Sequence, residues 1–310
     1  RCWVFPQLAL HPHPQTAAVG GAIASALARG LNLRQLTDAV TAAVTLITVG
    51  DYRHAVEGAL VRNVWAAVGC TNGMRAADWA QCGIGGLLRG PYAVYTELLG
   101  QWPAAEFLDT DLGKEWAITM GYHKIHACCQ STHSAVEAML QARERTPRDK
   151  DAKSIRQVTL ETHRPGMSNK QPVTTLAAKF SFEHVVATAY AYGHAGHEAF
   201  SAATLNEPRV KELREKVELV KYEPIPPRPH DRPARITLHF DDGATLTTEC
   251  LSARGGPDQP FAEEVIIGKI GRITAGVYPN FFRPFRALLD ADSSVKAKRW
   301  SALVREFTAA

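Results

Sequence analysis

The chain has 310 residues, of which 45% are hydrophobic and 21% are charged, values typical of a globular protein. This composition excludes a disordered chain, a collagen and a long coiled coil. The net charge of +4 is too small, without a long basic run, to indicate a nucleic-acid partner. The longest nearly apolar stretch, residues 39–49, is far shorter than the ~20 residues of a membrane-spanning helix.

The cysteines indicate the compartment. None of the six lies in a C-x-x-C pair, and two are adjacent, a spacing that rarely closes a disulfide without strain. Scattered thiols in a chain of this size are typical of a reducing compartment, so we expect a cytoplasmic protein. The chain begins with Arg1 and has no basic-then-apolar opening typical of a signal peptide, which suggests a piece of something longer. The cysteines are Cys2, Cys70, Cys82, Cys128, Cys129 and Cys250.

The first half of the chain has helical patterns. Residues 16–33 are rich in Ala, Gly and Leu, and apolar residues recur at helical spacing over 36–47 and 61–80. The abundance of small residues predicts tight packing of helix on helix. Residues 83–90 predict a turn-rich break, after which Pro91 starts another helix. In the helix over 61–80 we expect five side chains to point inward: Trp65, Val68, Met74, Ala77 and Trp79.

The pattern changes after a charged linker at residues 143–153. After this linker, segments in which apolar and polar residues alternate, as in strands, take turns with segments in which apolar residues recur at helical spacing. Asp242-Gly243 predicts a hairpin turn between two strands. The expected elements in order are a strand from 155 to 162, a buried helix over 174–192, a charged helix over 208–217, strands over 234–240 and 244–250, and helices from 261 onward.

These elements predict a mainly α protein with a smaller α+β domain. We expect an all-helical body over residues 1–144, an α+β lid over 145–257 and a helical tail over 258–310 that returns to the body. Clefts between such units are common ligand sites.

Two polar segments could carry chemistry but have ordinary explanations. Residues 82–90 partly match a dinucleotide-binding loop, but they follow a helix and not a strand, which favours a helix–helix turn. Residues 123–133 hold three histidines and two cysteines, which suggests zinc, but adjacent cysteines seldom both reach one tetrahedral ion. Lys124 in this segment is either a surface lysine or a buried cation that could act as acid or base.

Two further segments hold basic side chains at helix entrances. His11 and His13, separated by Pro12, directly precede the first Ala/Gly-rich helix, where a histidine can act as acid or base or bind a carboxylate. Arg62 opens the helix of Trp65, and its planar guanidinium suits bidentate carboxylate binding. Each could equally be a solvated surface residue.

Taken in order, these segments resemble the MmgE/PrpD family, which includes 2-methylcitrate dehydratase, cis-aconitate decarboxylase and iminodisuccinate epimerase. The resemblance runs over nearly the whole chain, and the order and spacing of its blocks carry it. The blocks are His11-Pro12 with the following Gly20-Gly21 helix, residues 61–77, residues 121–133, residues 178–182 and the turn at Asp242-Gly243.

The resemblance assigns roles to individual residues. His11 and Lys124 match catalytic positions, and Arg62 stands where many members have a lysine, which keeps the charge but loses the proton-transfer option. Cys129 stands where the decarboxylases have histidine, which argues against decarboxylation of that kind. His126 replaces a residue that is usually aromatic. We therefore expect His11 and Lys124 to be catalytic, and we expect Arg62, His13, His126 and Cys129 to bind substrate.

The resemblance implies a lyase that needs no cofactor and no metal and works as a homodimer. The expected reaction is dehydration of a 2-methylcitrate-like tricarboxylate, as in propionate metabolism, by abstraction of a proton α to a carboxylate. Three alternatives stay open: an epimerase of an iminodisuccinate-like dicarboxylate, a truncated inactive paralogue that only binds carboxylates, and a zinc protein. Members of the family are longer, so the resemblance implies amino-terminal helices that this chain lacks.

Overall fold

The structure is a computed structural model that describes residues 10–100, 112–114 and 116–309. The chain forms two compact units. The first holds Arg1–Ala117 and His126–Ser252, and the second holds Ile118–Ile125 and Ala253–Ala310. Cys2 lies outside the described residues. None of the helices in the described ranges combines the length and the apolar character needed to span a bilayer. The three-part organisation expected from the sequence is a different division, and it stays a prediction.

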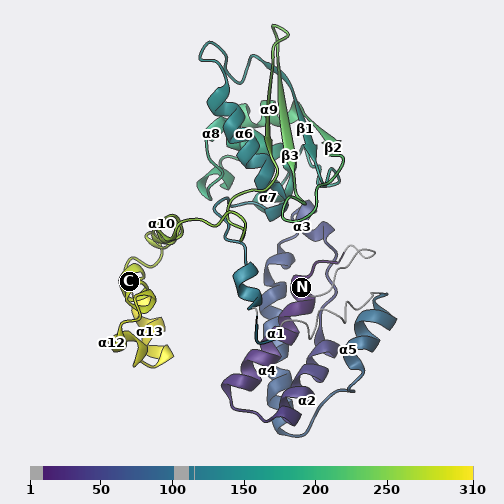
Figure 1. The fold of residues 1–310 in the computed structure, drawn as a ribbon, viewed down its shortest axis with the longest axis vertical. Coiled ribbons are helices and arrows are strands. Elements are labelled where there is room, and N and C mark those ends of the chain that lie inside the picture. The colour runs from purple at the N-terminus through teal and green to yellow at the C-terminus, as the bar shows by residue number, and fades with distance from the viewer. Residues whose placement is uncertain (1–9, 101–111, 115, 310) are drawn as a thin grey trace. The chain divides into compact units, whose positions relative to one another are not determined.

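Three helices that pack through small residues begin the first unit (Figure 1). They are α1 (His13–Ala28), α2 (Leu33–Ala43) and α4 (Trp65–Gln81). A Cβ atom at Gly21 would lie 2.8 Å from the Cys70 carbonyl oxygen, and one at Gly69 would lie 2.8 Å from the Ala17 Cβ. The tight helix packing predicted from the sequence is therefore confirmed. The buried core of these helices consists of Ala22, Ala26, Ala39, Ala42, Ala43, Ala76, Ala77 and Ala80.

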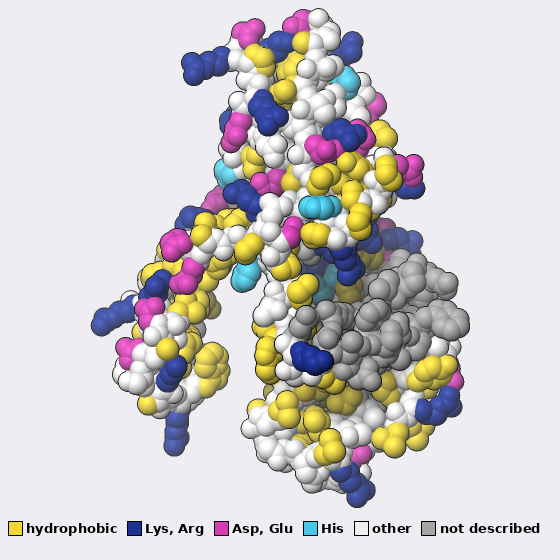
Figure 2. All heavy atoms as spheres, in the orientation of Figure 1, with side chains coloured by type: hydrophobic (Ala, Val, Ile, Leu, Met, Phe, Trp, Pro, Cys, Tyr) yellow, Lys and Arg dark blue, Asp and Glu magenta, His cyan; other side chains and the backbone are white. Residues whose placement is uncertain are grey.

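The expected orientation of α4 was wrong for its large apolar residues. Trp65 and Ala77 are buried, but Val68 is 41% exposed, Met74 50% and Trp79 39%. The reason is steric: only Gly and Ala let α4 approach α1 and α2 closely, so the helix turns its small residues inward and its larger ones outward. Hydrophobic side chains consequently lie on the surface over these helices (Figure 2).

Replacing Gly73 with Ala tests this packing. The new Cβ would overlap the Ala18 carbonyl oxygen and lie 2.5 Å from the Ala22 nitrogen, so α1 must shift. We expect a loss of about 1–3 kcal/mol in the free energy of unfolding, measured by urea denaturation. Gly20→Ala is the control, because nothing lies within 4 Å of its Cβ. That variant should be stabilised by about 0.5–1 kcal/mol. Equal effects at the two positions would contradict the packing described.

Short helices and a β-bridge connect the three long helices of this part. Leu10 pairs with Asp51 in an isolated β-bridge. The glycine-rich residues 82–89 form the loop between α4 and α5, where the Gly86 N–H donates to Thr41 Oγ1 at 3.1 Å. The predicted helix–helix turn is confirmed. The elements are η1 (Val44–Leu46), α3 (Arg53–Glu57), η2 (Leu60–Val64), α5 (Gly90–Tyr92) with Pro91 in its first turn, and η3 (Ala93–Leu98).

The rest of the first unit is an α+β part built on a four-stranded sheet in the order β2-β1-β3-β4. β1 pairs in parallel with β2, and the other pairs are antiparallel. The strands predicted from 155 to 162, from 234 to 240 and from 244 are confirmed, whereas β2 was missed because it follows a charged helix directly. The bounds are β1 Ile155–Thr162, β2 Val217–Lys221, β3 Ala234–Phe240 and β4 Thr245–Cys250.

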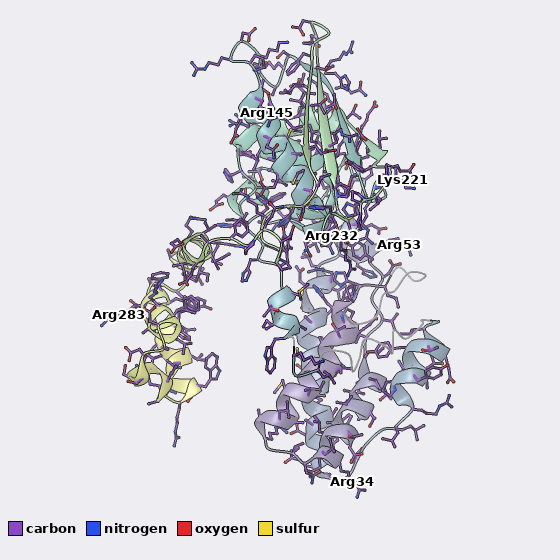
Figure 3. All side chains as sticks on the ribbon, viewed as in Figure 1. Arg34, Arg53, Arg145, Lys221, Arg232 and Arg283 are labelled. Atoms are coloured by element: carbon purple, nitrogen blue, oxygen red, sulfur yellow. The ribbon has the colours of Figure 1, made fainter. Side chains whose placement is uncertain are left out.

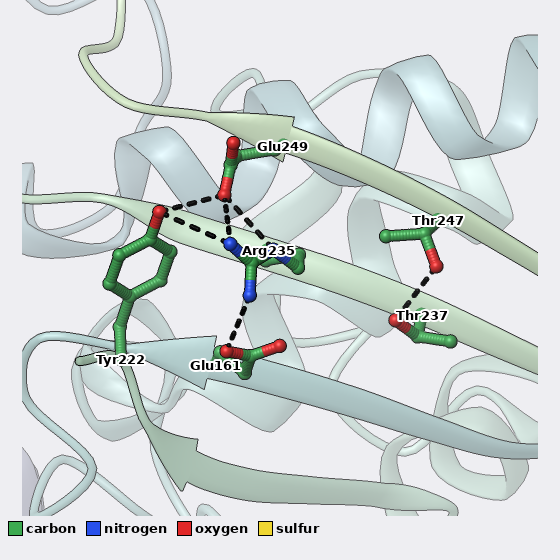
Figure 4. Close-up of polar contacts among 6 residues, drawn as sticks. All are labelled: Glu161, Tyr222, Arg235, Thr237, Thr247 and Glu249. Atoms are coloured by element: carbon green, nitrogen blue, oxygen red, sulfur yellow. Dashed lines mark hydrogen bonds and ion pairs between the residues drawn. The ribbon is translucent and has the colours of Figure 1, made fainter. Parts of the chain in front are cut away.

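The two faces of the sheet differ. Alternate residues of β3, such as Ile236 and Leu238, are buried against α6 (His133–Arg145). On the opposite face Arg235 reaches Glu161 on β1 at 2.9 Å and Glu249 on β4 at 2.7 Å, and Tyr222 O–H donates to Glu249 at 2.7 Å (Figure 4). These ion pairs connect three strands on the exposed face.

The buried helix expected over 174–192 is divided at Ser181. Its backbone there is extended (φ −86°, ψ 120°), which ends α7 (Thr175–Phe180), and its hydroxyl accepts the His184 N–H to start α8 (Phe182–Tyr192). The fully buried Glu183 carboxylate accepts the Asn169 N–H at 3.0 Å and the Ser168 hydroxyl. Glu183 therefore holds the loop after β1 in place. The remaining elements are η6 (Gln130–Thr132), η7 (Glu198–Phe200) and α9 (Pro208–Glu215).

The helices predicted from residue 261 onward are present in the second unit. A small core of Val295, Leu303 and Phe307 holds its last helices together. The segment 118–125 joins this unit through the His123 N–H, which donates to the Gly255 carbonyl at 2.8 Å. Its helices are α10 (Glu263–Thr274), α11 (Phe282–Leu289), α12 (Ser293–Lys296) and α13 (Trp300–Phe307).

Candidate active site

His11 is the centre of an aromatic cluster in the first unit. Its backbone N–H donates to the Gly50 carbonyl at 2.8 Å beside the Leu10–Asp51 bridge. The side chain is only 4% exposed. The imidazole stacks on the Tyr52 ring with 5.4 Å between centroids, and it lies 5.6 Å from Trp65. His11 is thus held in one orientation in surroundings with little water.

Arg62 lies against His11 although 51 residues separate them in sequence. The guanidinium Nη2 is 3.3 Å from His11 Nε2, and the guanidinium carbon lies 5.5 Å from the Phe180 ring centroid. Because arginine can only donate, Nε2 accepts this hydrogen bond. Arg62 Nε is buried and has no hydrogen-bond partner within the described ranges, so one donor is left for a ligand.

Tyr52 joins this group to two segments from the α+β part. Its hydroxyl oxygen lies 3.7 Å from Cys129 Sγ, and the Arg164 guanidinium lies 5.1 Å from its ring centroid. The Cys129 N–H donates to the Lys179 carbonyl of α7 at 2.9 Å, which fixes the position of the thiol. We call the set His11, His13, Tyr52, Arg62, Cys129 and Arg164 the His11 cluster. His13 belongs to it through an edge-on ring contact with His11 at 4.4 Å.

The environment shifts two pKa values of the cluster in opposite directions. Burial, followed by the charges of His13 and Arg62, lowers the pKa of His11 to about 4. Burial and the neighbouring Cys129 raise the pKa of Tyr52 well above its usual value. At neutral pH His11 is therefore an unprotonated base and Tyr52 a protonated acid. Two groups separated in this way are a common basis for acid–base catalysis.

A cavity of about 620 Å³ adjoins Tyr52 and Arg164. Its size is in the range of small-molecule sites. The Arg53 guanidinium on its wall is paired with Asp51 at 2.6 Å, whereas Arg164 forms no ion pair among the residues that the structure describes. Arg164 is therefore available to a carboxylate. The lining residues are Tyr52, Arg53, Val56, Glu57, Arg164, Gly166, Met167, Ser168 and Asn169.

Comparison with known proteins identifies the family. The model of the MmgE/PrpD C-terminal domain matches residues 126–281, half of the chain. The chain belongs to the MmgE/PrpD family. It is also 26% identical over 318 aligned residues to a cis-aconitate decarboxylase-like protein, oryM, of Aspergillus oryzae. The match covers 96% of this chain but 64% of that relative, so the chain spans less than two thirds of the relative's length.

The other two residues that the MmgE/PrpD resemblance singled out are His126 and Lys124. Within the described ranges, His126 has no hydrogen bond or ring contact with the His11 cluster: its Nε2 lies 3.1 Å from the Glu137 carboxylate and its ring lies 5.1 Å from His133. Lys124 is exposed and belongs to the second unit, where the Lys269 ammonium donates to its carbonyl oxygen. Their roles toward substrate stay predictions.

The same segment was considered as a zinc site because of its histidines and cysteines. Over the part of the chain that the structure describes, no three His, Cys, Asp or Glu side chains converge in a way that could hold a metal ion. His126 faces Glu137, and Cys129 faces Tyr52.

Tyr52 and Arg164 were missed from the sequence. Tyr52 lies in the run Asp51-Tyr52-Arg53-His54 just after an apolar stretch. Arg164 is the second residue after the end of β1, and loops after strands are a common position for ligand-binding residues. Both signals were weak, because the contacts that make these residues notable join segments far apart in the chain: Tyr52 contacts Cys129, and Arg164 lies over Tyr52.

Proposed function

We propose that the His11 cluster is the catalytic site of a lyase that removes a proton α to a carboxylate in a small di- or tricarboxylate. The observation that carries the proposal is the contact between three groups: a base that is neutral at pH 7, an acid that keeps its proton, and the Arg62 cation beside the base. Membership of the MmgE/PrpD family and the decarboxylase-like relative support a lyase.

The reaction requires charge stabilisation, because a proton α to a carboxylate is only weakly acidic in water. When substrate binds, the Arg62 N–H turns from His11 Nε2 to the substrate carboxylate; the freed Nε2 lone pair then takes the proton, and the electron pair of the broken C–H bond moves toward the carboxylate. Arg62 lies beside Nε2 and stabilises the negative charge that develops there. The low exposure of His11 strengthens this interaction, since few water molecules compete for the guanidinium.

In a dehydration the same electron pair then forms the double bond as the C–O bond breaks. The departing hydroxyl takes the proton of Tyr52 and leaves as water. Protonated His11 and deprotonated Tyr52 return to their starting states by proton exchange through solvent. The His11 and Tyr52 rings stack with 5.4 Å between their centroids. One small substrate can therefore contact both the base and the acid.

We propose a 2-methylcitrate-like tricarboxylate as the substrate of this dehydration. A specific observation favours a second candidate: the Aspergillus oryzae relative is named for cis-aconitate decarboxylation. The thiol of Cys129 lies beside Tyr52. The family resemblance implies a histidine at this position in the decarboxylases, which favours dehydration here.

Product analysis separates these reactions. The full-length protein is incubated with 2-methylcitrate, cis-aconitate and iminodisuccinate after chelation, and the products are identified by mass spectrometry. Loss of water from the first substrate supports dehydration, loss of carbon dioxide from the second supports decarboxylation, and inversion of the third supports epimerisation. If all three return unchanged but bind, the protein is a carboxylate-binding paralogue, and the proposed catalytic role is wrong.

Replacing Arg164 with Met tests the cavity as the place where substrate carboxylates bind. The change keeps the volume and removes the guanidinium that lies over Tyr52. We expect KM to rise about tenfold or more with a smaller change in kcat, because the lost contact acts mainly on binding. Arg156→Met is the control, since Arg156 is an exposed arginine on β1, the strand that precedes Arg164. Equal kinetics of the two variants would remove Arg164 from the site.

A further inference from the structure

A second cavity lies in the first unit where α6 ends. Its volume is about 510 Å³, again in the range of small-molecule sites. None of its described lining residues belongs to the His11 cluster. The two regions lie apart: Figure 3 shows Arg145, at the end of α6, well separated from Arg53 on α3. The charged lining residues are Arg143, Arg148, Lys150, Asp151, Lys153, Arg209 and Glu212.

Part of this charge is already neutralised. Lys150 Nζ pairs with the Asp242 carboxylate at 2.6 Å, and Arg209 pairs with Glu207 at 2.8 Å. Glu212 pairs with Lys216 at 2.9 Å, so its carboxylate does not compensate the cations of the cavity.

Among the residues that the structure describes, three cations on the wall have no carboxylate partner. Arg143 Nε donates to the Tyr190 carbonyl at 2.7 Å, which leaves its two Nη groups, and neither Arg148 nor Lys153 forms an ion pair within the described part of the chain. The remaining acid, Asp151, accepts the backbone N–H groups of Lys153 and Ser154 and so stabilises the loop itself. The cavity therefore carries a clear excess of positive charge.

The rest of the wall is apolar. Tyr190, Ala191 and Leu213 lie on it, and Tyr190 is fixed by a hydrogen bond from its hydroxyl to Thr146 at 3.4 Å. A cavity lined by both cations and apolar side chains suits a ligand that has both a charged and an organic part.

We propose that this cavity binds a small phosphorylated organic molecule. Guanidinium groups bind phosphate oxygens in a bidentate way, and three cations without an ion pair, set against the one carboxylate of Asp151, match the charge of a diphosphate group better than that of a single carboxylate. The organic part of the ligand lies against Tyr190 and Leu213. This site goes beyond the proposed lyase reaction, since it shares no residue with the His11 cluster.

Isothermal titration calorimetry with sodium pyrophosphate tests the proposal at constant ionic strength. We expect saturable binding to the wild-type protein and binding about tenfold weaker or more in the double variant Arg148→Ser/Lys153→Ser. Both side chains are exposed and form no ion pair with other described residues, so the variant should fold. Its thermal denaturation without ligand should match that of the wild type.

Two controls locate the binding. Arg145→Ser removes an exposed cation from the same helix end that does not line the cavity, and it should leave pyrophosphate binding unchanged. Arg62→Met alters the His11 cluster and should also leave it unchanged, which separates this site from the proposed active site.

A parallel titration with citrate tests the phosphate preference. We expect citrate binding to depend on Arg62 and not on Arg148 and Lys153. Pyrophosphate binding that is equal in the wild type and the double variant, or absent from both, would overturn the site. Citrate binding more tightly than pyrophosphate through Arg148 and Lys153 would overturn the assignment of a phosphorylated ligand.

Discussion

Replacing His11 with Gln is expected to lower kcat of the full-length protein about a hundredfold or more, on the order of 3 kcal/mol of transition-state stabilisation. The Gln amide can still accept the hydrogen bond from Arg62 in place of Nε2, so the cluster should keep its arrangement. Substrate binding should therefore change much less than turnover. Rates measured under saturating substrate, together with KM, separate the two effects. Unchanged kcat would exclude His11 as the base.

The pH dependence of kcat/KM tests the same role of His11. A general base must be unprotonated, and burial with the charges of His13 and Arg62 lowers the pKa of His11 to about 4. Wild-type kcat/KM should therefore hold as the pH falls from 7 and decline only near pH 4, where His11 gains its proton. A decline centred near pH 6.5 would indicate an ordinary solvated histidine.

His13→Gln is the matched control for this profile. It removes a neighbouring charge that lowers the pKa of His11, so the acid limb should move to higher pH while kcat at neutral pH stays near the wild-type value. Coincident profiles of the wild type and this variant would show that His11 is not the group that titrates.

Replacing Lys124 with Met is expected to lower kcat about a hundredfold. This again corresponds to a loss on the order of 3 kcal/mol of transition-state stabilisation. The change keeps the volume and deletes the ammonium that the MmgE/PrpD resemblance places among the catalytic groups. A surface lysine without a role would show almost no effect, which makes kcat a decisive readout. Lys296→Met, an exposed lysine of the same unit, is the control.

Lys269 gives this variant a second readout. Burial, followed by the charge of Lys124, lowers the pKa of Lys269, whose ammonium donates to the Lys124 carbonyl. Removing the Lys124 charge should raise the pKa of Lys269 toward its ordinary value, measured by NMR titration of the lysine side chains. Normal turnover together with this pKa change would show an intact variant and a lysine that plays no catalytic part.

The sequence predicted much of the fold because its signals are local. Alternation of buried and exposed residues defined β3, and Asp242-Gly243 defined the turn after it, where Gly243 has φ +84°. The short strand β2 was missed because it directly follows a charged helix and exists through its pairing with β1. The division at Ser181 was missed although its cause is local: the extended serine ends one helix and its hydroxyl caps the next. The inward face of α4 also depended on α1, which no periodicity within α4 reveals.

The candidate site could also be predicted only in part, because its residues come from distant segments of the chain. The sequence singled out His11 and Arg62 separately, and the structure brings them to 3.3 Å. Tyr52 was missed because a tyrosine between Asp51 and Arg53 is unremarkable until its hydroxyl faces Cys129 and its ring faces His11. A pKa shift arises from burial and neighbouring charge, and neither can be read from one short segment.

Proton exchange measured by NMR in D₂O tests most directly whether His11 removes a proton α to a carboxylate. The full-length protein is incubated with 2-methylcitrate, and deuterium is followed at the carbon next to the carboxylate. Incorporation by the wild type that falls about a hundredfold or more in His11→Gln is the predicted result. Exchange at equal rates in both proteins, or product formed with no loss of that proton, would contradict it.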